Sequence, residues 1–210
     1  MPGRQSNLQS TNEKIDNLFK QNKMRKLISS INITLDGFCD HTAVIADDEL
    51  HQNANELLRS ADTILFGRVT YQLMESGWPP VVKKPTGINS VDEFAILIDN
   101  ISKIVFSNTL KNVEWKNTKL AKGGIEEEVL KLKQSRNSGS KNILVGSPSI
   151  LITLMQLGLI DEYQFCVQPI VLGSGLSLFK NIKDRINLKL LKTRTFGSGV
   201  VTLYYEPMKK

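Results

Sequence analysis

The stretch TILFGRVTYQ, residues 63–72, joins an apolar run to the start of a helical pattern through a glycine. The run is typical of a buried strand, and Gly67 ends it directly before Arg68 and Thr70. A helix N-terminus carries unpaired backbone N–H groups and about half a positive charge, so a glycine turn into a helix can bind an anion. Arg68 would add a bidentate cation and Thr70 a hydroxyl donor. A plain turn followed by a solvated arginine explains this stretch equally well.

A second turn of the same kind occurs in NILVGSPSILITLMQLG, residues 142–158. A buried strand ends at Gly146, Ser147 can cap the helix that follows, and Pro148 suits the first position of that helix. If the two parent strands are parallel neighbours, both helix N-termini lie beyond the carboxyl ends of the strands, where open α/β sheets bind nucleotides. The pair of turns therefore favours a site for a diphosphate.

The rest of the chain predicts a sheet covered by helices. Runs rich in Val, Ile and Phe alternate with stretches of helical period from residue 25 onward. The tail holds two long strands, INLKLLKTRTF and GVVTLYYEP, which we expect to form an antiparallel hairpin. We therefore expect an α/β fold, with a mixed sheet flanked by helices. The predicted strands are residues 26–34, 63–66, 103–107, 142–145 and 162–172, and the predicted helices are residues 48–60, 69–76, 91–99, 125–134 and 149–157.

Length and composition limit the class of protein. The chain has 210 residues, 40% of them hydrophobic, which suits one large domain with a full core. Residues 1–23 are rich in Gln, Asn, Ser and Lys, and we expect a disordered or weakly helical extension outside a domain of residues 24–210. Cys39 and Cys166 have no C-x-x-C spacing and no accompanying histidine cluster, so neither a disulfide framework nor a metal site is expected.

Charge and hydropathy limit the partners. The net charge of +6 comes from scattered lysines rather than from a basic stripe, so we expect no nucleic-acid partner. No apolar run approaches the ~20 residues that cross a bilayer, and no signal peptide is apparent. We therefore expect a cytoplasmic protein that does not bind membranes.

Four segments carry a family resemblance: LISSINITLDGF, ADTILFGRVTYQ, VFSNTL and GLIDEYQFCVQPIVLGSGLSLF. In this order they resemble the reductase domain of the bacterial bifunctional riboflavin-biosynthesis deaminase-reductase, the RibD C-terminal domain, and more broadly the dihydrofolate reductase-like superfamily. The resemblance spans residues 25–206. It implies a dihydrofolate reductase-like fold, NADPH as the hydride donor and commonly a homodimer.

The resemblance also implies roles for individual residues. Asp36 and Gly37 resemble the turn beside the nicotinamide and the substrate. Three further segments resemble cofactor-binding turns: Gly67, Arg68 and Thr70 the pyrophosphate-binding helix start, Gly146, Ser147 and Ser149 the second phosphate-binding turn, and Ser107, Asn108 and Thr109 the segment that meets the adenosine 2′-phosphate.

Three departures from the family pattern matter. Relatives often carry an arginine where this chain has Asn108, so the usual guanidinium for a 2′-phosphate is missing and NADH becomes possible beside NADPH. The second turn reads Gly146-Ser147, where Gly-Gly is common. No zinc motif of a deaminase accompanies the reductase part, which argues against the bifunctional enzyme itself.

A hydride-transfer site needs side chains that position the reactants and a proton donor for the acceptor. Asp36 is the best candidate for catalysis and substrate contact, although an Asp-Gly turn explains it as well. Asp48 and His51 are further substrate-binding candidates, and Asp47 or Asp48 can instead cap the helix that follows. Trp78 lies in the proline-rich stretch 75–87, which we expect to be a loop long enough for a lid. Its ring can stack on a substrate or pack the loop down.

We therefore expect a stand-alone NAD(P)H-dependent reductase that acts on a small heterocyclic or carbonyl-type acceptor. One alternative is a true dihydrofolate reductase, whose pterin-binding carboxylate would have to be Glu56. Another is a nucleotide-binding protein that keeps the fold without turnover, which Asn108 and the Gly146-Ser147 turn would favour.

Residues 165–172 keep apolar residues on both faces of a predicted strand, and the tail hairpin adds further apolar residues over 200–205. A strand that is apolar on both faces needs cover on both. Earlier helices or a second copy of the chain can supply this cover. With the resemblance, the pattern predicts a homodimer whose interface includes part of these strands.

Overall fold

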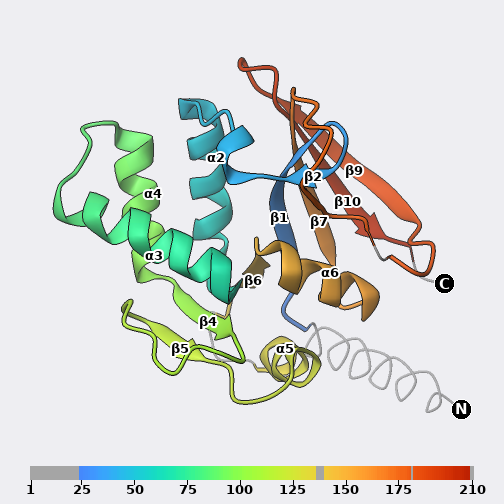
Figure 1. Cartoon of the computed structure of the whole chain (residues 1–210), viewed down its shortest axis with the longest axis horizontal. Helices are drawn as coiled ribbons and strands as arrows, with labels where there is room; N and C mark the ends of the chain where they lie inside the picture. Colours follow the sequence, from blue (N-terminus) through green and yellow to red (C-terminus); the bar gives the residue numbers. More distant parts are fainter. Residues whose placement is uncertain (1–23, 136–139, 181, 209–210) are drawn as a thin grey trace, which may run out of the picture.

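A single large sheet organises the molecule. The computed structural model describes residues 24–135, 140–180 and 182–208, so the predicted extension of residues 1–23 lies outside the described residues. The strands of the sheet are β1 (Leu27–Thr34), β3 (Ala61–Gly67), β4 (Ser102–Phe106), β5 (Thr118–Leu120), β6 (Asn142–Val145), β7 (Glu162–Gln168), β9 (Leu188–Thr195) and β10 (Val201–Pro207). They lie in the order β5-β4-β3-β6-β1-β7-β10-β9 (Figure 1).

The sheet is mixed, as the sequence predicts. The strands from β5 to β7 are parallel to their neighbours, whereas β10 is antiparallel to both β7 and β9. Two short strands, β2 (Phe38–Cys39) and β8 (Leu176–Ser177), pair with each other outside the main sheet. A single-turn 3-10 helix, η1 (His41–Ala43), follows β2. The parallel part is what gives the molecule one edge where several strands end together.

Helices cover both faces of the parallel strands. On one face lie α2 (Asp48–Arg59), α3 (Arg68–Lys83) and α4 (Asn89–Asn100), and on the other lie α5 (Ile125–Gln134) and α6 (Pro148–Gln156) (Figure 1). Strand β1 therefore buries side chains in both directions, with Ile28 in one core and Leu27 and Ile31 in the other. Its consecutive apolar residues Leu27 and Ile28 thus point to opposite faces of the sheet. Within the described residues, no helix combines the length and the apolar composition that a membrane span requires.

Helix α3 is longer than the sequence predicts. It occupies most of the stretch that was expected to form a lid loop. The pattern predicts an end at residue 76, yet the helix continues to Lys83 with Pro79 and Pro80 inside it. A proline usually bends or ends a helix because it lacks an N–H donor. Here Trp78 packs against Phe94 of α4, with ring centroids 4.4 Å apart, and we attribute the continuation to this contact. The stretch 75–87 is therefore mostly helix rather than a loop.

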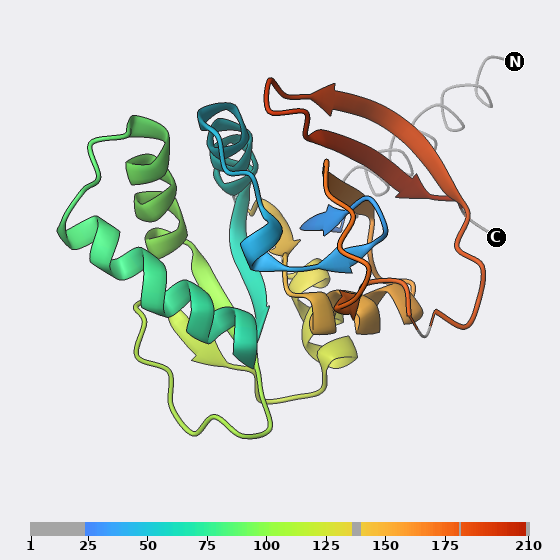
Figure 2. The same cartoon turned by 45° about the horizontal axis from the view of Figure 1, so that its top comes forward.

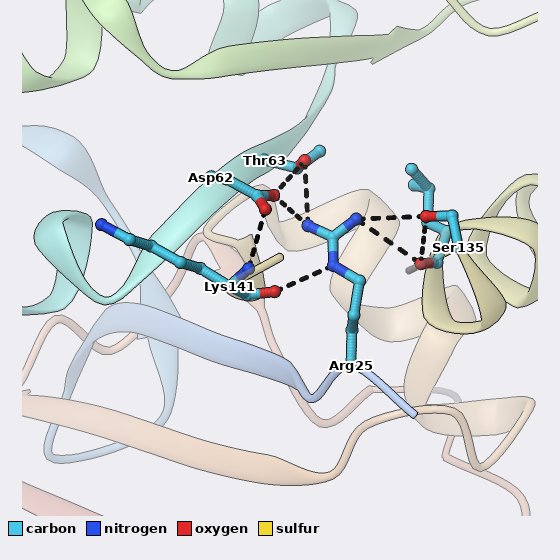
Figure 3. A network of polar contacts seen from close by, with 6 residues as sticks. Arg25, Asp62, Thr63, Ser135 and Lys141 are labelled. Carbon is cyan, nitrogen blue, oxygen red and sulfur yellow. Dashed lines mark hydrogen bonds and ion pairs between the residues drawn. The ribbon is translucent and has the colours of Figure 1, made fainter. Parts of the chain in front are cut away.

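Arg25, two residues before β1, closes the end of the sheet where the parallel strands begin (Figure 3). Its guanidinium pairs with Asp62 of β3, bonds the Thr63 hydroxyl at 3.2 Å and bonds the Lys141 carbonyl before β6 at 2.8 Å. Asp62 also accepts the Lys141 N–H at 2.8 Å. Because these groups satisfy one another's hydrogen bonds, they hold the amino ends of β1, β3 and β6 together. The glycine turns lie at the opposite end of the sheet, after the carboxyl ends of the strands.

The C-terminal hairpin of β9 and β10 forms the far edge of the sheet (Figure 2). Tyr204 of β10 is buried: its hydroxyl donates to Asn53 of α2 at 3.1 Å, and the Lys192 ammonium lies 4.4 Å from the ring centroid. An earlier helix therefore covers this face, so Tyr204 is not available for a contact between chains. Leu190 and Leu191 of β9 remain 50% and 43% exposed.

Candidate functional site

The two glycine turns lie side by side. Strands β3 and β6 are parallel neighbours, with Leu65 paired to Val145, so α3 and α6 both begin at the same edge of the sheet. The Gly67 N–H donates to the Ser147 hydroxyl at 3.0 Å, and this hydroxyl lies 2.8 Å from the Thr70 hydroxyl. The predicted adjacency of the turns is confirmed, and a hydrogen-bonded serine joins them.

Space is tight at both glycine turns because other groups approach closely. A Cβ at Gly67 would lie 2.9 Å from the Ser149 hydroxyl and 3.1 Å from the Ser147 hydroxyl. A Cβ at Gly146 would lie 3.1 Å from the Ser30 carbonyl oxygen of β1. The sequence predicts turns at these positions, and the structure adds that space limits the choice of residue there.

Anion-binding groups are exposed around this pair of turns. Neither α3 nor α6 has a side-chain cap at its N-terminus, whereas Asp47 caps α2 by accepting the Leu50 N–H at 2.7 Å. Arg68 is exposed, and its guanidinium donates to Gln72 at 3.1 Å. The mutual bond of Thr70 and Ser147 uses one hydroxyl proton and leaves the other for a ligand. The geometry suits a phosphate held between two helix N-termini.

The third predicted cofactor-binding segment lies at the same end of the sheet as the two glycine turns. Ser107, Asn108 and Thr109 directly follow β4, which pairs with β3 through Gly67 and Phe106. The Ser107 hydroxyl accepts the Thr109 N–H at 3.1 Å, which folds the segment into a turn. Asn108 and Thr109 are exposed. The three predicted segments thus follow β4, β3 and β6, three neighbouring strands, in that order along one edge.

A cavity of about 330 Å³ opens beside this edge, within the size range of small-molecule sites. It lies between α2, α3, α4 and the sheet, and four of the predicted site residues line it: His51, Thr70, Trp78 and Gly146. His51 lies at the first turn of α2, with Nδ1 3.0 Å from the Asp47 carbonyl oxygen. A carbonyl only accepts, so Nδ1 carries the proton and Nε2 is available to exchange one. The other lining residues are Ser30, Asn32, Val44, Ala46, Leu50, Ala54, Leu57, Leu58, Ile64, Phe66, Met74, Phe94, Ile98, Leu144 and Val145.

Asp36 lies outside this cavity and has a structural role. Its carboxylate accepts the Leu172 N–H at 3.1 Å, the Gly173 N–H at 2.7 Å and the Thr34 hydroxyl at 2.5 Å. These bonds, the Thr34 hydroxyl first, lower the pKa of Asp36 to about 2. Asp36 is therefore ionised at neutral pH and has no proton to donate, which speaks against its predicted catalytic role. The adjoining Gly37 has a φ of +81°, which a glycine adopts without strain.

Two other acidic residues point away from the cavity. Asp48 is exposed and accepts from Gln52 at 2.6 Å on the outer side of α2. Glu56, the residue that a pterin site would need, is exposed and pairs with Arg194 at 3.0 Å. Neither residue lines the cavity. The structure therefore does not support Asp48 as a substrate contact or Glu56 as a buried pterin ligand.

The side chain of Asn32 is a polar group in the cavity wall that the sequence did not point to. The Asn32 side-chain oxygen accepts from Gln168 Nε2 at 3.0 Å, and Gln168 Oε1 accepts the Ile45 N–H at 2.9 Å. This relay fixes which end of the Asn32 amide is free, because Nδ2 has no acceptor among the described residues. A polar residue between Ile31 and Ile33 in an apolar strand is the sequence signal that could have identified it.

The fold is that of a dihydrofolate reductase-like α/β protein. The structure resembles that of a putative riboflavin biosynthesis protein from Shewanella sp. PV-4, with a TM-score of 0.67 and 19% identity, covering 88% of this chain and 99% of that one. It also resembles dihydrofolate reductase from Enterococcus faecalis complexed with NADP(H), with a TM-score of 0.57 and 13% identity, covering 88% of this chain and 97% of that one.

The family follows from the sequence itself. The model of the RibD C-terminal domain matches residues 25–202, so the chain belongs to the RibD C-terminal domain family. The uncharacterized protein YyaP of Bacillus subtilis (strain 168) is 36% identical over 188 residues, which cover 87% of this chain and 95% of that protein. The predicted family and fold are confirmed.

Proposed function

We propose that the chain is an NAD(P)H-dependent reductase that transfers a hydride to a small acceptor. The observation that carries this proposal is the line of three turns after the neighbouring strands β4, β3 and β6, which leads to the cavity beside Gly146. A dinucleotide laid along this edge has its pyrophosphate at the uncapped starts of α3 and α6 and its reactive end at the cavity mouth.

The residues fit a nicotinamide dinucleotide. Gly67 and Gly146 allow close approach of the backbone, and Arg68 supplies a guanidinium with a single side-chain bond, to Gln72. The bound cofactor would supply the hydride. His51 is the titratable side chain in the described cavity wall, and we assign it the proton delivered to the acceptor.

The choice between NADPH and NADH rests on the segment after β4. Asn108 is exposed there and offers an amide rather than a guanidinium to a 2′-phosphate. We therefore propose that NADPH is used with weak discrimination against NADH. The absence of a carboxylate from the described cavity wall disfavours folate as the substrate.

We also propose a homodimer, with its interface on the exposed side of β9. Leu190 and Leu191 lie on the edge strand of the sheet and are half exposed, so an interface there would bury apolar surface. The location in the cytoplasm stays a prediction.

Arg68→Ala tests the cofactor site. Loss of a charge-assisted hydrogen bond should weaken NADPH binding by about 1.5–3 kcal/mol, measured by titration of the cofactor with the purified protein. Arg185→Ala is the matched control, because Arg185 is an exposed arginine outside the candidate site. Equal affinities for the Arg68 variant and the wild type would refute the phosphate site. NADPH binding without oxidation across a panel of acceptors would instead indicate a nucleotide-binding protein without turnover.

A further inference from the structure

The side chains that line the cavity indicate a class of substrate. This inference rests on the proposed reductase function. Among the residues that the structure describes, no Lys, Arg, Asp or Glu side chain lines the cavity. Aliphatic and aromatic side chains make up most of the wall, including Phe66, Trp78 and Phe94. We infer that the acceptor is a neutral, largely apolar aromatic carbonyl compound, held through its carbonyl oxygen by the amide of Asn32.

The absence of ionisable side chains other than His51 decides against a charged acceptor. A phosphate or carboxylate group loses its hydration when it enters an apolar cavity, and it requires a paired cation to offset that cost. Arg68 is exposed at the start of α3 and does not line the cavity. A charged acceptor would therefore find no Lys or Arg side chain to pair with among the described residues that line the space between α2, α3 and α4.

The aromatic residues suit a flat ring. Trp78 and Phe94 lie with their ring centroids 4.4 Å apart and an interplanar angle of 53°, and His51 meets Phe94 edge-on with centroids 6.2 Å apart. Such a wall offers both ring faces and ring edges, which favour offset or T-shaped contacts with an aromatic ligand. The volume of about 330 Å³ limits the ligand to a small ring system.

Asn32 supplies the polar contact that orients this ligand. Gln168 is buried and donates to the Asn32 oxygen, and the Ile45 N–H in turn holds the Gln168 oxygen. The relay therefore keeps Nδ2 of Asn32 as the group that remains for a ligand acceptor atom. When bound, the cofactor would supply the hydride that forms the new C–H bond at the carbonyl carbon. Nε2 of His51 would pass a proton taken up from solvent to the carbonyl oxygen, which forms the O–H bond. The products are an alcohol and the oxidised cofactor.

Binding of three probes without cofactor tests the inference. The probes are acetophenone, its hydrocarbon counterpart ethylbenzene, and the anionic 4-acetylbenzoate, and their affinities are measured by ligand-observed NMR titration. We expect acetophenone to bind at least 10-fold more tightly than 4-acetylbenzoate. Asn32→Leu, which removes the amide at nearly constant volume, should weaken acetophenone about 10-fold and leave ethylbenzene unchanged. Asn187→Leu, an exposed asparagine outside this cavity, is the matched control.

A second variant tests the inference even if Asn32→Leu does not fold. Leu57→Lys places an ammonium in the cavity wall at a half-buried position. It should reverse the preference, so that 4-acetylbenzoate binds more tightly than acetophenone. Equal or tighter binding of 4-acetylbenzoate to the wild type, or equal losses of acetophenone and ethylbenzene in Asn32→Leu, would overturn the inference.

NADPH oxidation with the same probes separates the inference from the proposed function. Acetophenone that binds as expected but is not reduced supports the substrate site and refutes the reductase. Reduction of 4-acetylbenzoate in preference to acetophenone overturns the neutral substrate class and leaves the reductase standing.

Discussion

Replacing Ser147 with alanine tests how the two glycine turns are joined. Ser147 is 1% exposed, and its hydroxyl accepts the Gly67 N–H at 3.0 Å and contacts the Thr70 hydroxyl at 2.8 Å. Alanine removes both bonds without adding volume. The Gly67 N–H then lies buried without an acceptor, which costs about 1–3 kcal/mol, whereas the half-buried Thr70 hydroxyl can turn toward solvent. We expect the free energy of unfolding to fall by about 2 kcal/mol.

Urea unfolding measures this loss directly. With an m-value of ~2 kcal/mol/M, the midpoint should fall by about 1 M without a change of slope. Ser149→Ala is the matched control, because Ser149 is an exposed serine two residues away whose hydroxyl bonds nothing among the described residues. Its effect should lie within about 0.5 kcal/mol. An equally small effect of Ser147→Ala would refute the idea that this hydroxyl holds the turns together.

Three further predictions concern specificity, pH and assembly. Asn108→Arg should tighten NADPH binding about 10-fold and leave NADH unchanged in parallel titrations, and equal changes for both would place this residue away from the 2′-phosphate. Burial lowers the pKa of Lys103 to about 8. The folded chain therefore releases this proton at lower pH than the unfolded chain, so the folded state gains stability as the pH rises. The free energy of unfolding of the wild type, relative to that of Lys103→Met, should rise by roughly 3 kcal/mol from pH 7 to 10.5 in urea unfolding. A pH-independent difference would contradict this. If the proposed dimer forms, Leu191→Glu should convert it to the 23.5 kDa monomer in light scattering, and a monomeric wild type would refute the proposal.

Local signals account for the parts of the fold that the sequence predicts well. Helix α5 and strand β6 have the predicted bounds, because each is a short periodic segment with clear ends. The glycine turns were also predictable, since Gly67 and Gly146 each interrupt an apolar run before a helical pattern. Three of the proposed site residues that line the cavity, His51, Thr70 and Gly146, belong to turns or helices whose positions follow from local pattern.

Contacts between distant segments account for what the sequence did not predict. Helix α3 passes through Pro79 and Pro80 while Trp78 packs on Phe94, sixteen residues further along the chain. The carboxylate of Asp36 binds backbone N–H groups of a loop 136 residues away, which no local pattern reveals. The Asn32 relay likewise spans 136 residues to Gln168. Each of these depends on strand order, which periodicity alone does not determine.

The bond between Ser147 and Gly67 has a consequence for the speed and cost of ligand binding. Because one hydroxyl spans both turns, the starts of α3 and α6 cannot drift apart independently, and the spacing of their N–H groups is set before any ligand arrives. A ligand that bridges them then loses little of its binding free energy to ordering the protein. Association should therefore proceed in a single kinetic phase, with no slow rearrangement after the encounter.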